Sequence, residues 1–140
     1  MEENKGKFRF NAVCVDFDGV IAGFADNIEE FGTVIPGARE ALQQLRDTGY
    51  KIIIHTARPS DEAHREQLAQ YLQQHGIPFD EINQNSDCTW PATKPPADLY
   101  IDDRALRFEG DWQETIVEAM QILRPSHASQ TTMGFQIAES

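Results

Sequence analysis

The amino-acid sequence predicts an α/β protein built on a mainly parallel sheet. Short apolar, β-branched runs alternate along the chain with segments of helical periodicity, a pattern typical of right-handed β-α-β crossovers. Three of the apolar runs end directly in polar residues, as buried parallel strands do at a ligand-binding edge. We therefore expect a three-layer α/β/α, Rossmann-like fold, with one domain over residues 1–125 and a tail without regular structure over residues 126–140.

The first strand is predicted at residues 12–15, an apolar and partly β-branched run that leads into Asp16-Phe17-Asp18-Gly19. The first helix should begin after Pro36-Gly37 and end at Gly49, a residue suited to the left-handed conformation that often follows a helix. Its apolar positions recur at helical spacing: Ala38, Ala41, Leu42 and Leu45.

A second strand is expected at Tyr50–His55, where three consecutive isoleucines are too short a run for a helix. This strand ends at Thr56-Ala57-Arg58-Pro59. The next helix should take Ser60 as its N-cap and run to about His75.

The third and fourth strands are predicted at Phe79–Ile82 and Asp98–Ile101, on either side of a polar, proline-bearing loop. The fourth strand leads straight into Asp102-Asp103. A last helix should begin at the capping pair Asp111 and Glu114 and stop before Pro125. Its apolar stripe is Trp112, Ile116, Met120 and Leu123.

Polar residues fall at the carboxyl ends of three predicted strands, where ligands bind to open parallel sheets. They are Asp16, Asp18, Thr56, Asp102 and Asp103. Carboxylates gathered at one sheet edge repel one another by about 1 to 4 kcal/mol per pair at 4 Å, so a cation must compensate. Hard oxygen ligands favour Mg²⁺, and with a lysine nearby the set suits phosphoryl transfer.

The same residues, in this order, resemble the four motifs of the haloacid dehalogenase-like phosphohydrolase superfamily. Asp16-Phe17-Asp18-Gly19-Val20 resembles the first motif and Thr56 the second. Lys94 resembles the third and Ile101-Asp102-Asp103 the acidic fourth. The resemblance spans nearly all of residues 12–123; position 20 departs from it, being Val where Thr is commoner.

The resemblance implies a phosphatase that forms an aspartyl phosphate on Asp16, with Asp18 as general acid and then general base. It also implies that Thr56 and the adjacent Ala57 bind the phosphoryl group, and that Lys94 pairs with Asp16 and phosphate. Mg²⁺ would be held by Asp16, the backbone carbonyl of Asp18, Asp102 and, directly or through water, Asp103. An acid at position 18 disfavours carbon–halogen cleavage, because the dehalogenases that named the superfamily lack it.

Members of this superfamily often carry a cap domain, but here only a short flap over residues 20–35 fits before the first helix. An open site suits a large substrate, such as a phosphorylated glycan, nucleic-acid end or protein, or a site completed by a neighbouring subunit. The substrate is expected to be either a small phosphorylated metabolite or the phosphorylated end of a macromolecule. The apolar groups of the flap either form a homo-oligomer interface or pack on their own sheet. Arg58 and Arg104 either contact a distal anionic group of the substrate or pair with nearby acids.

A net charge of -11 argues against nucleic acid and anionic membrane as partners. The polar N-terminus lacks the apolar core of a secretory signal, so we expect a cytoplasmic location. The alternatives are a non-catalytic phosphate-binding protein and a phospho-receiver signalling domain. A receiver would place its phosphorylated Asp after a middle strand, whereas the middle strand here ends in His55-Thr56.

Overall fold

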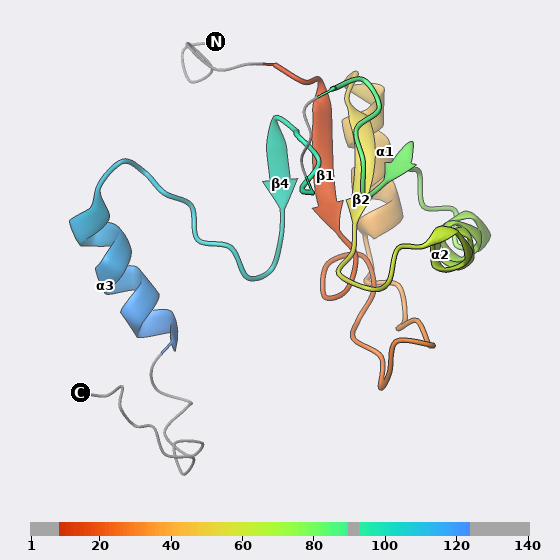
Figure 1. Ribbon diagram of the computed structural model, residues 1–140, viewed down its shortest axis with the longest axis horizontal. Helices are drawn as coiled ribbons and strands as arrows, with labels where there is room; N and C mark the ends of the chain where they lie inside the picture. Colours follow the sequence, from red (N-terminus) through yellow and green to blue (C-terminus); the bar gives the residue numbers. More distant parts are fainter. Residues whose placement is uncertain (1–8, 90–92, 124–140) are drawn as a thin grey trace. The chain divides into compact units, whose positions relative to one another are not determined.

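A computed structural model of the chain describes residues 9–89 and 93–123. It contains a four-stranded sheet in the order β3-β2-β1-β4, in which every neighbouring pair is parallel (Figure 1). The strands are β1 (Ala12–Asp16), β2 (Lys51–His55), β3 (Glu81–Ile82) and β4 (Leu99–Ile101). The predicted α/β fold with a mainly parallel sheet is therefore confirmed.

The described residues also form three helices: α1 (Ala38–Asp47), α2 (Glu62–Gln74) and α3 (Trp112–Leu123). The chain divides into two compact units, Met1–Asp103 with the sheet, α1 and α2, and Arg104–Ser140 with α3. The prediction of a single domain over residues 1–125 stays a prediction. The predicted tail, residues 126–140, lies outside the described residues.

The main core of the first unit lies between one face of the sheet and helices α1 and α2. Alternate residues of β1 and β2 point into it, because successive side chains of a strand face opposite sides. Helix α1 contributes Leu42, and helix α2 contributes Leu68 and Leu72. The strand residues of this cluster are Val13, Val15, Ile52 and Ile54. Each such fully buried side chain stabilises the fold by about 1.5 to 3 kcal/mol.

The opposite face of the sheet carries a smaller cluster of Ala12, Cys14 and Ile53, against which Phe10 and Ala97 pack. Burial raises the pKa of the Cys14 thiol to about 11. The thiol is therefore uncharged near neutral pH and a poor nucleophile.

Strand β3 starts two residues later than the predicted Phe79, because a side chain takes the place of a strand carbonyl. The carboxylate of Asp80 accepts a hydrogen bond from the backbone N–H of Ile52 at 2.8 Å. The N–H of Asp80 in turn donates to the carbonyl of Ile52, also at 2.8 Å. Regular pairing with β2 therefore begins only at Glu81.

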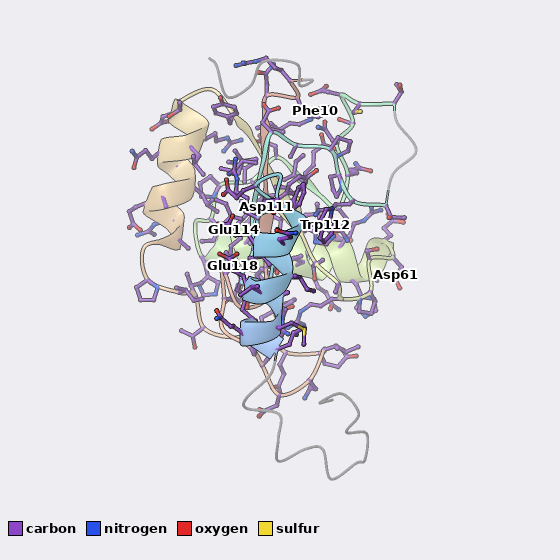
Figure 2. All side chains as sticks on the ribbon, turned by 90° about the vertical axis from the view of Figure 1, so that its left-hand side faces the viewer. Phe10, Asp61, Asp111, Trp112, Glu114 and Glu118 are labelled. Atoms are coloured by element: carbon purple, nitrogen blue, oxygen red, sulfur yellow. The ribbon has the colours of Figure 1, made fainter. Side chains whose placement is uncertain are left out.

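Helix α2 is capped by Asp61, one residue after the predicted Ser60. The Asp61 carboxylate accepts from the backbone N–H of His64 at 2.9 Å. Both residue types cap helices well, so the sequence alone does not choose between them. At the start of α3 the predicted cap Asp111, labelled in Figure 2, is confirmed: its carboxylate accepts from the N–H of Gln113 at 2.9 Å.

The flap, residues 20–35, is a hairpin-like excursion between β1 and α1. Its base is paired by hydrogen bonds from Gly23 N–H to Thr33 O at 2.9 Å and from Ile35 N–H to Ile21 O at 2.8 Å. Ile21 is buried in the core, whereas Phe24 remains 63% exposed. Within the described residues this flap is the only insertion between β1 and α1, and no cap domain is inserted there. None of the described helices is long and apolar enough to cross a membrane.

Candidate active site

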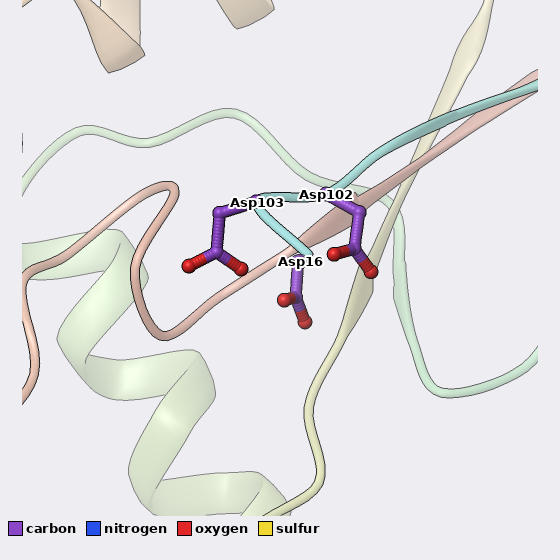
Figure 3. A group of neighbouring side chains, drawn as sticks. All are labelled: Asp16, Asp102 and Asp103. Carbon is purple, nitrogen blue, oxygen red and sulfur yellow. The ribbon is translucent and has the colours of Figure 1, made fainter. Parts of the chain in front are cut away.

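Three carboxylates meet at the carboxyl ends of β1 and β4 (Figure 3). Asp16 is the last residue of β1, and Asp102 and Asp103 directly follow β4. The parallel register pairs Val15 with Ile101, so the next residue on each strand is an aspartate. One carboxylate oxygen from each of the three lies within 4.8 Å of the others. The sheet thus brings together Asp16, Asp102 and Asp103 as the sequence predicts.

The negative charges of this cluster repel one another, which favours binding of a cation. Burial raises the pKa of Asp16, and the neighbouring charges of Asp102 and Asp103 raise it further. His55 opposes the rise, with its Nδ1 atom 3.8 Å from Oδ1 of Asp16. Three clustered, oxygen-only ligands of negative charge fit Mg²⁺, which binds through one or two carboxylates plus water and substrate oxygens. The residues present therefore suit the predicted metal.

The loop after β1 is a tight turn around the carbonyl of Phe17. That oxygen accepts from the N–H groups of Val20, Ile21 and Ala22 at 3.3, 3.0 and 3.1 Å. Gly19 within this turn has φ +89°, a conformation that side chains rarely adopt. The turn holds the backbone of Asp18 next to the acidic cluster.

The carboxylate of Asp18 is not a member of the acidic cluster and is bound by Arg58. The guanidinium donates from Nε to Oδ2 and from Nη2 to Oδ1, both at 2.9 Å. The Asp18 side chain is 22% exposed and that of Arg58 is 11% exposed. The structure thus places Arg58 beside a predicted catalytic residue.

Thr56 is buried in the loop directly after β2, as the sequence predicts. Its backbone N–H donates to Oδ1 of Asn83 at 2.9 Å, and the amide of Asn83 donates back to the Thr56 carbonyl at 3.2 Å. The Thr56 hydroxyl accepts from the N–H of Arg58 at 3.0 Å, which leaves the hydroxyl hydrogen able to donate elsewhere. Ala57 follows at the exposed surface of the same turn.

Lys94 shares an open cavity with the predicted nucleophile Asp16 and with Asp102. Its ammonium lies 4.2 Å from the centre of the Tyr100 ring, within the range of a cation–π contact. A lysine here can neutralise negative charge over the cluster. Arg104, the other predicted substrate contact, begins the second unit, so its role stays a prediction.

Sequence reasoning missed two residues that shape the site. Asn83 fixes the Thr56 turn and has φ 58°, a left-handed conformation that asparagine tolerates better than most residues. Tyr71 on α2 is the second, because its hydroxyl donates to the carbonyl of Gly32 in the flap. The only sequence signal for Asn83 was its position directly after the predicted strand that ends at Ile82. Nothing in the local sequence indicates the contact of Tyr71.

Two solved structures are similar to this chain. A conserved protein from Bacteroides thetaiotaomicron is 26% identical, with a TM-score of 0.57 over 81% of this chain and 92% of that one. A chain of the Pnkp1/Rnl/Hen1 complex is 18% identical, with a TM-score of 0.43 over 81% of this chain and 34% of that one. No curated protein matches the sequence.

The haloacid dehalogenase-like hydrolase family matches residues 13–93, more than half of the chain. The matched range contains Asp16, Asp18 and Thr56 and ends one residue before Lys94. The acidic pair Asp102-Asp103 follows it and is joined to Asp16 by the β1–β4 pairing. On this match and the parallel α/β fold, the chain belongs to the haloacid dehalogenase-like hydrolases.

Proposed function

We propose that this chain is a Mg²⁺-dependent phosphomonoester hydrolase that works through an aspartyl phosphate on Asp16. The observation that carries the proposal is the cluster of Asp16, Asp102 and Asp103, with carboxylate oxygens within 4.8 Å of one another. Thr56 and Lys94 supply a hydroxyl and a positive charge nearby, as phosphoryl transfer requires.

In the first step, a carboxylate oxygen of Asp16 attacks phosphorus and forms the aspartyl phosphate. The bond from phosphorus to the leaving oxygen breaks, and that oxygen keeps the electron pair and takes a proton from Asp18. Asp18 is suited to this role because it is two residues from Asp16, across the tight turn at Phe17.

In the second step, a water molecule attacks phosphorus and breaks the bond to Asp16. Asp18, now ionised, takes the proton of that water, so the step releases phosphate and restores both carboxyl groups. The two aspartates therefore have different roles although they are neighbours in the chain.

Charge compensation comes from three sources in this scheme. Mg²⁺, when bound, neutralises the carboxylates and the phosphoryl oxygens so that Asp16 can approach phosphorus. The Thr56 hydroxyl and the N–H of Ala57 donate hydrogen bonds to the phosphoryl group, and Lys94 adds a positive charge. Thr56 and Ala57 directly follow strand β2, which holds their donors in place before the substrate arrives.

The flap and the lack of an inserted cap between β1 and α1 favour an open site. Such a site accepts a small phosphorylated metabolite or the phosphorylated end of a macromolecule, and the net charge of -11 disfavours nucleic acid. Assembly through the exposed Phe24 and Ile28 of the flap, and a cytoplasmic location, remain predictions.

The test is phosphate release from a broad panel of phosphomonoesters, with Mg²⁺ or with a chelator. Three proteins are compared: the parent, Asp16→Asn, and Asp47→Asn as a matched exchange at an exposed residue of α1. We expect metal-dependent turnover in the parent and in Asp47→Asn, and none in Asp16→Asn. No release from any substrate would favour a non-catalytic phosphate-binding protein instead, and a long-lived acyl phosphate would favour a phospho-receiver.

A further inference from the structure

We propose that Arg58 is a positioning residue that couples the flap to the acid–base carboxylate of Asp18. This inference rests on the proposed phosphatase function, because it assigns Asp18 its role in proton transfer. It goes further in naming the group that sets the direction in which the Asp18 carboxylate points.

The contact between the two side chains is bidentate. Nε of Arg58 donates to Oδ2 of Asp18 and Nη2 donates to Oδ1, each at 2.9 Å. Two parallel bonds from a planar guanidinium fix the plane of the carboxylate as well as its position. With only 11% of the arginine side chain exposed, this pair differs from the mobile surface ion pairs that contribute little.

The same guanidinium also binds the flap. Its Nη1 donates to the backbone carbonyl of Ile28 at 2.8 Å. Its carbon Cζ lies 4.9 Å from the ring centre of Phe31, a second flap residue, and 5.8 Å from that of Phe17. The Arg58 guanidinium therefore contacts two parts of the flap, its tip at Ile28 and its aromatic base at Phe31. It also contacts the loop after β1, which carries Asp18.

Helix α2 holds the aromatic base of the flap. The ring of Tyr71 lies 4.8 Å from that of Phe31 and 5.7 Å from that of Phe17, and its hydroxyl donates to Gly32. The flap thus has one anchor on α2 and a second on Arg58. Movement of the tip around Ile28 changes only the second anchor, which is the one in contact with Asp18.

This arrangement has a consequence for proton transfer. Both carboxylate oxygens of Asp18 accept hydrogen bonds from Arg58 in one plane, so rotation of the carboxyl group toward a leaving group breaks at least one bond of this pair. Because Arg58 is held at the same time by Ile28, the position of the flap decides how easily that bond is released. Arg58 acts on the reaction through Asp18.

Lysine cannot replace this fork, because its ammonium is a single point of charge without two coplanar donors. Arg58→Lys therefore keeps the positive charge and removes the bidentate geometry. Arg39→Lys is the matched control, since Arg39 is exposed on α1 and, within the described residues, forms an ion pair only with its neighbour Glu40.

The kinetic test compares the parent with these two variants on p-nitrophenyl phosphate and on a simple alkyl phosphate. The nitrophenolate leaves with little need of a proton, whereas the alkoxide requires one. We expect Arg58→Lys to lower kcat by about 10- to 100-fold on the alkyl phosphate, less on p-nitrophenyl phosphate, and to leave KM nearly unchanged. Equal losses on both substrates, a change confined to KM, or no change would each overturn the inference.

A second measurement does not depend on turnover. Hydrogen exchange of the flap amides is compared in the parent, Arg58→Lys, Asp18→Asn and the double variant. We expect faster exchange around residues 27–31 in each single variant and no further increase in the double variant, because both changes remove one link. If the parent is active and the variants exchange their flap amides as slowly as the parent does, the coupling is contradicted. A parent that hydrolyses no phosphomonoester would instead contradict the proposed function itself.

Discussion

A Cβ atom at Gly19 would lie 2.6 Å from Oδ2 of Asp103, closer than such atoms approach in proteins. The same atom would lie 2.9 Å from the ring of Phe24. Gly19 is therefore the point where the loop after β1, the flap and the acidic pair after β4 come into direct contact. A methyl group there would displace one member of the acidic cluster.

Gly19→Ala is predicted to lower activity at least 100-fold, because Asp103 and the Phe17 turn cannot both keep their positions. Gly37→Ala provides the matched control: Gly37 has φ +92° against +89° for Gly19, and nothing lies within 4 Å of its Cβ position. Both variants should lose about 1 kcal/mol of stability from backbone strain. Steady-state kinetics and thermal unfolding check this, and similar activity losses in the two variants would refute it.

Asp16→Asn is predicted to stabilise the metal-free protein near neutral pH while abolishing activity. Removal of one charge from a cluster within 4.8 Å relieves repulsion of about 1 to 3 kcal/mol. Because burial and the neighbouring acids raise the pKa of Asp16, the folded parent binds this proton more readily than the unfolded chain. The extra stability of Asp16→Asn over the parent is therefore complete well above the raised pKa of Asp16, and it shrinks as the pH falls through that pKa.

Thermal unfolding of the parent, Asp16→Asn and Asp47→Asn in chelator, from pH 4 to pH 8, measures this effect. Added Mg²⁺ should raise the Tm of the parent more than that of Asp16→Asn, since it relieves the same repulsion. An Asp16→Asn protein that is less stable than the parent at pH 7 without metal would show that the cluster is not under electrostatic strain.

Glu81→Gln is predicted to destabilise the fold by about 1 to 2 kcal/mol at neutral pH. Burial raises the pKa of Glu81, but hydrogen bonds from Lys51 at 2.7 Å and from Ser86 outweigh it, so the pKa lies below the ordinary 4.5. The stabilisation is present above the unfolded value and is lost as the pH falls through the folded pKa.

Urea unfolding at pH 7 and at pH 3 checks the role of Glu81, with Glu66→Gln as a control at an exposed residue of α2. The difference between Glu81→Gln and the parent should shrink at the lower pH. A difference independent of pH would mean that Glu81 stabilises the fold by packing alone.

Asn83→Gly is predicted to raise KM about 3- to 10-fold, because Thr56 loses the side chain that holds its backbone N–H at 2.9 Å. Glycine keeps the left-handed conformation at φ 58° without strain, so the change isolates the side-chain hydrogen bonds. Asn11→Gly, at φ 54° on an exposed residue, controls for the backbone exchange. Equal kinetics in the two variants would exclude a supporting role for Asn83.

The sequence predicts the acidic cluster well because Asp16 and Asp102 stand at the ends of strands that the local apolar pattern marks. Once β1 and β4 are parallel neighbours that pair Val15 with Ile101, Asp16 and Asp102 must lie side by side. The same reasoning places Thr56 at the next strand end. The boundaries of the elements were harder to predict. The Asp80 carboxylate accepts a hydrogen bond from β2 where a strand carbonyl was expected, and Asp61 caps α2 where Ser60 was expected.

Contacts between side chains distant in sequence could not be predicted. Arg58 and Asp18 are 40 residues apart. The sequence alone allowed two roles for Arg58, contact with the substrate or an ion pair with a nearby acid. The contact of Tyr71 with Gly32 spans 39 residues and depends on how α2 packs on the flap. Such pairings require the fold itself.

The most direct test of the central claim is transfer of a labelled phosphoryl group to the protein, followed by acid quench and peptide mapping. The account predicts an acyl phosphate on Asp16 that forms only with Mg²⁺, is absent from Asp16→Asn, and disappears during a chase at the steady-state rate of hydrolysis. Label on a different residue, or label on Asp16 that outlasts many turnovers, would contradict it.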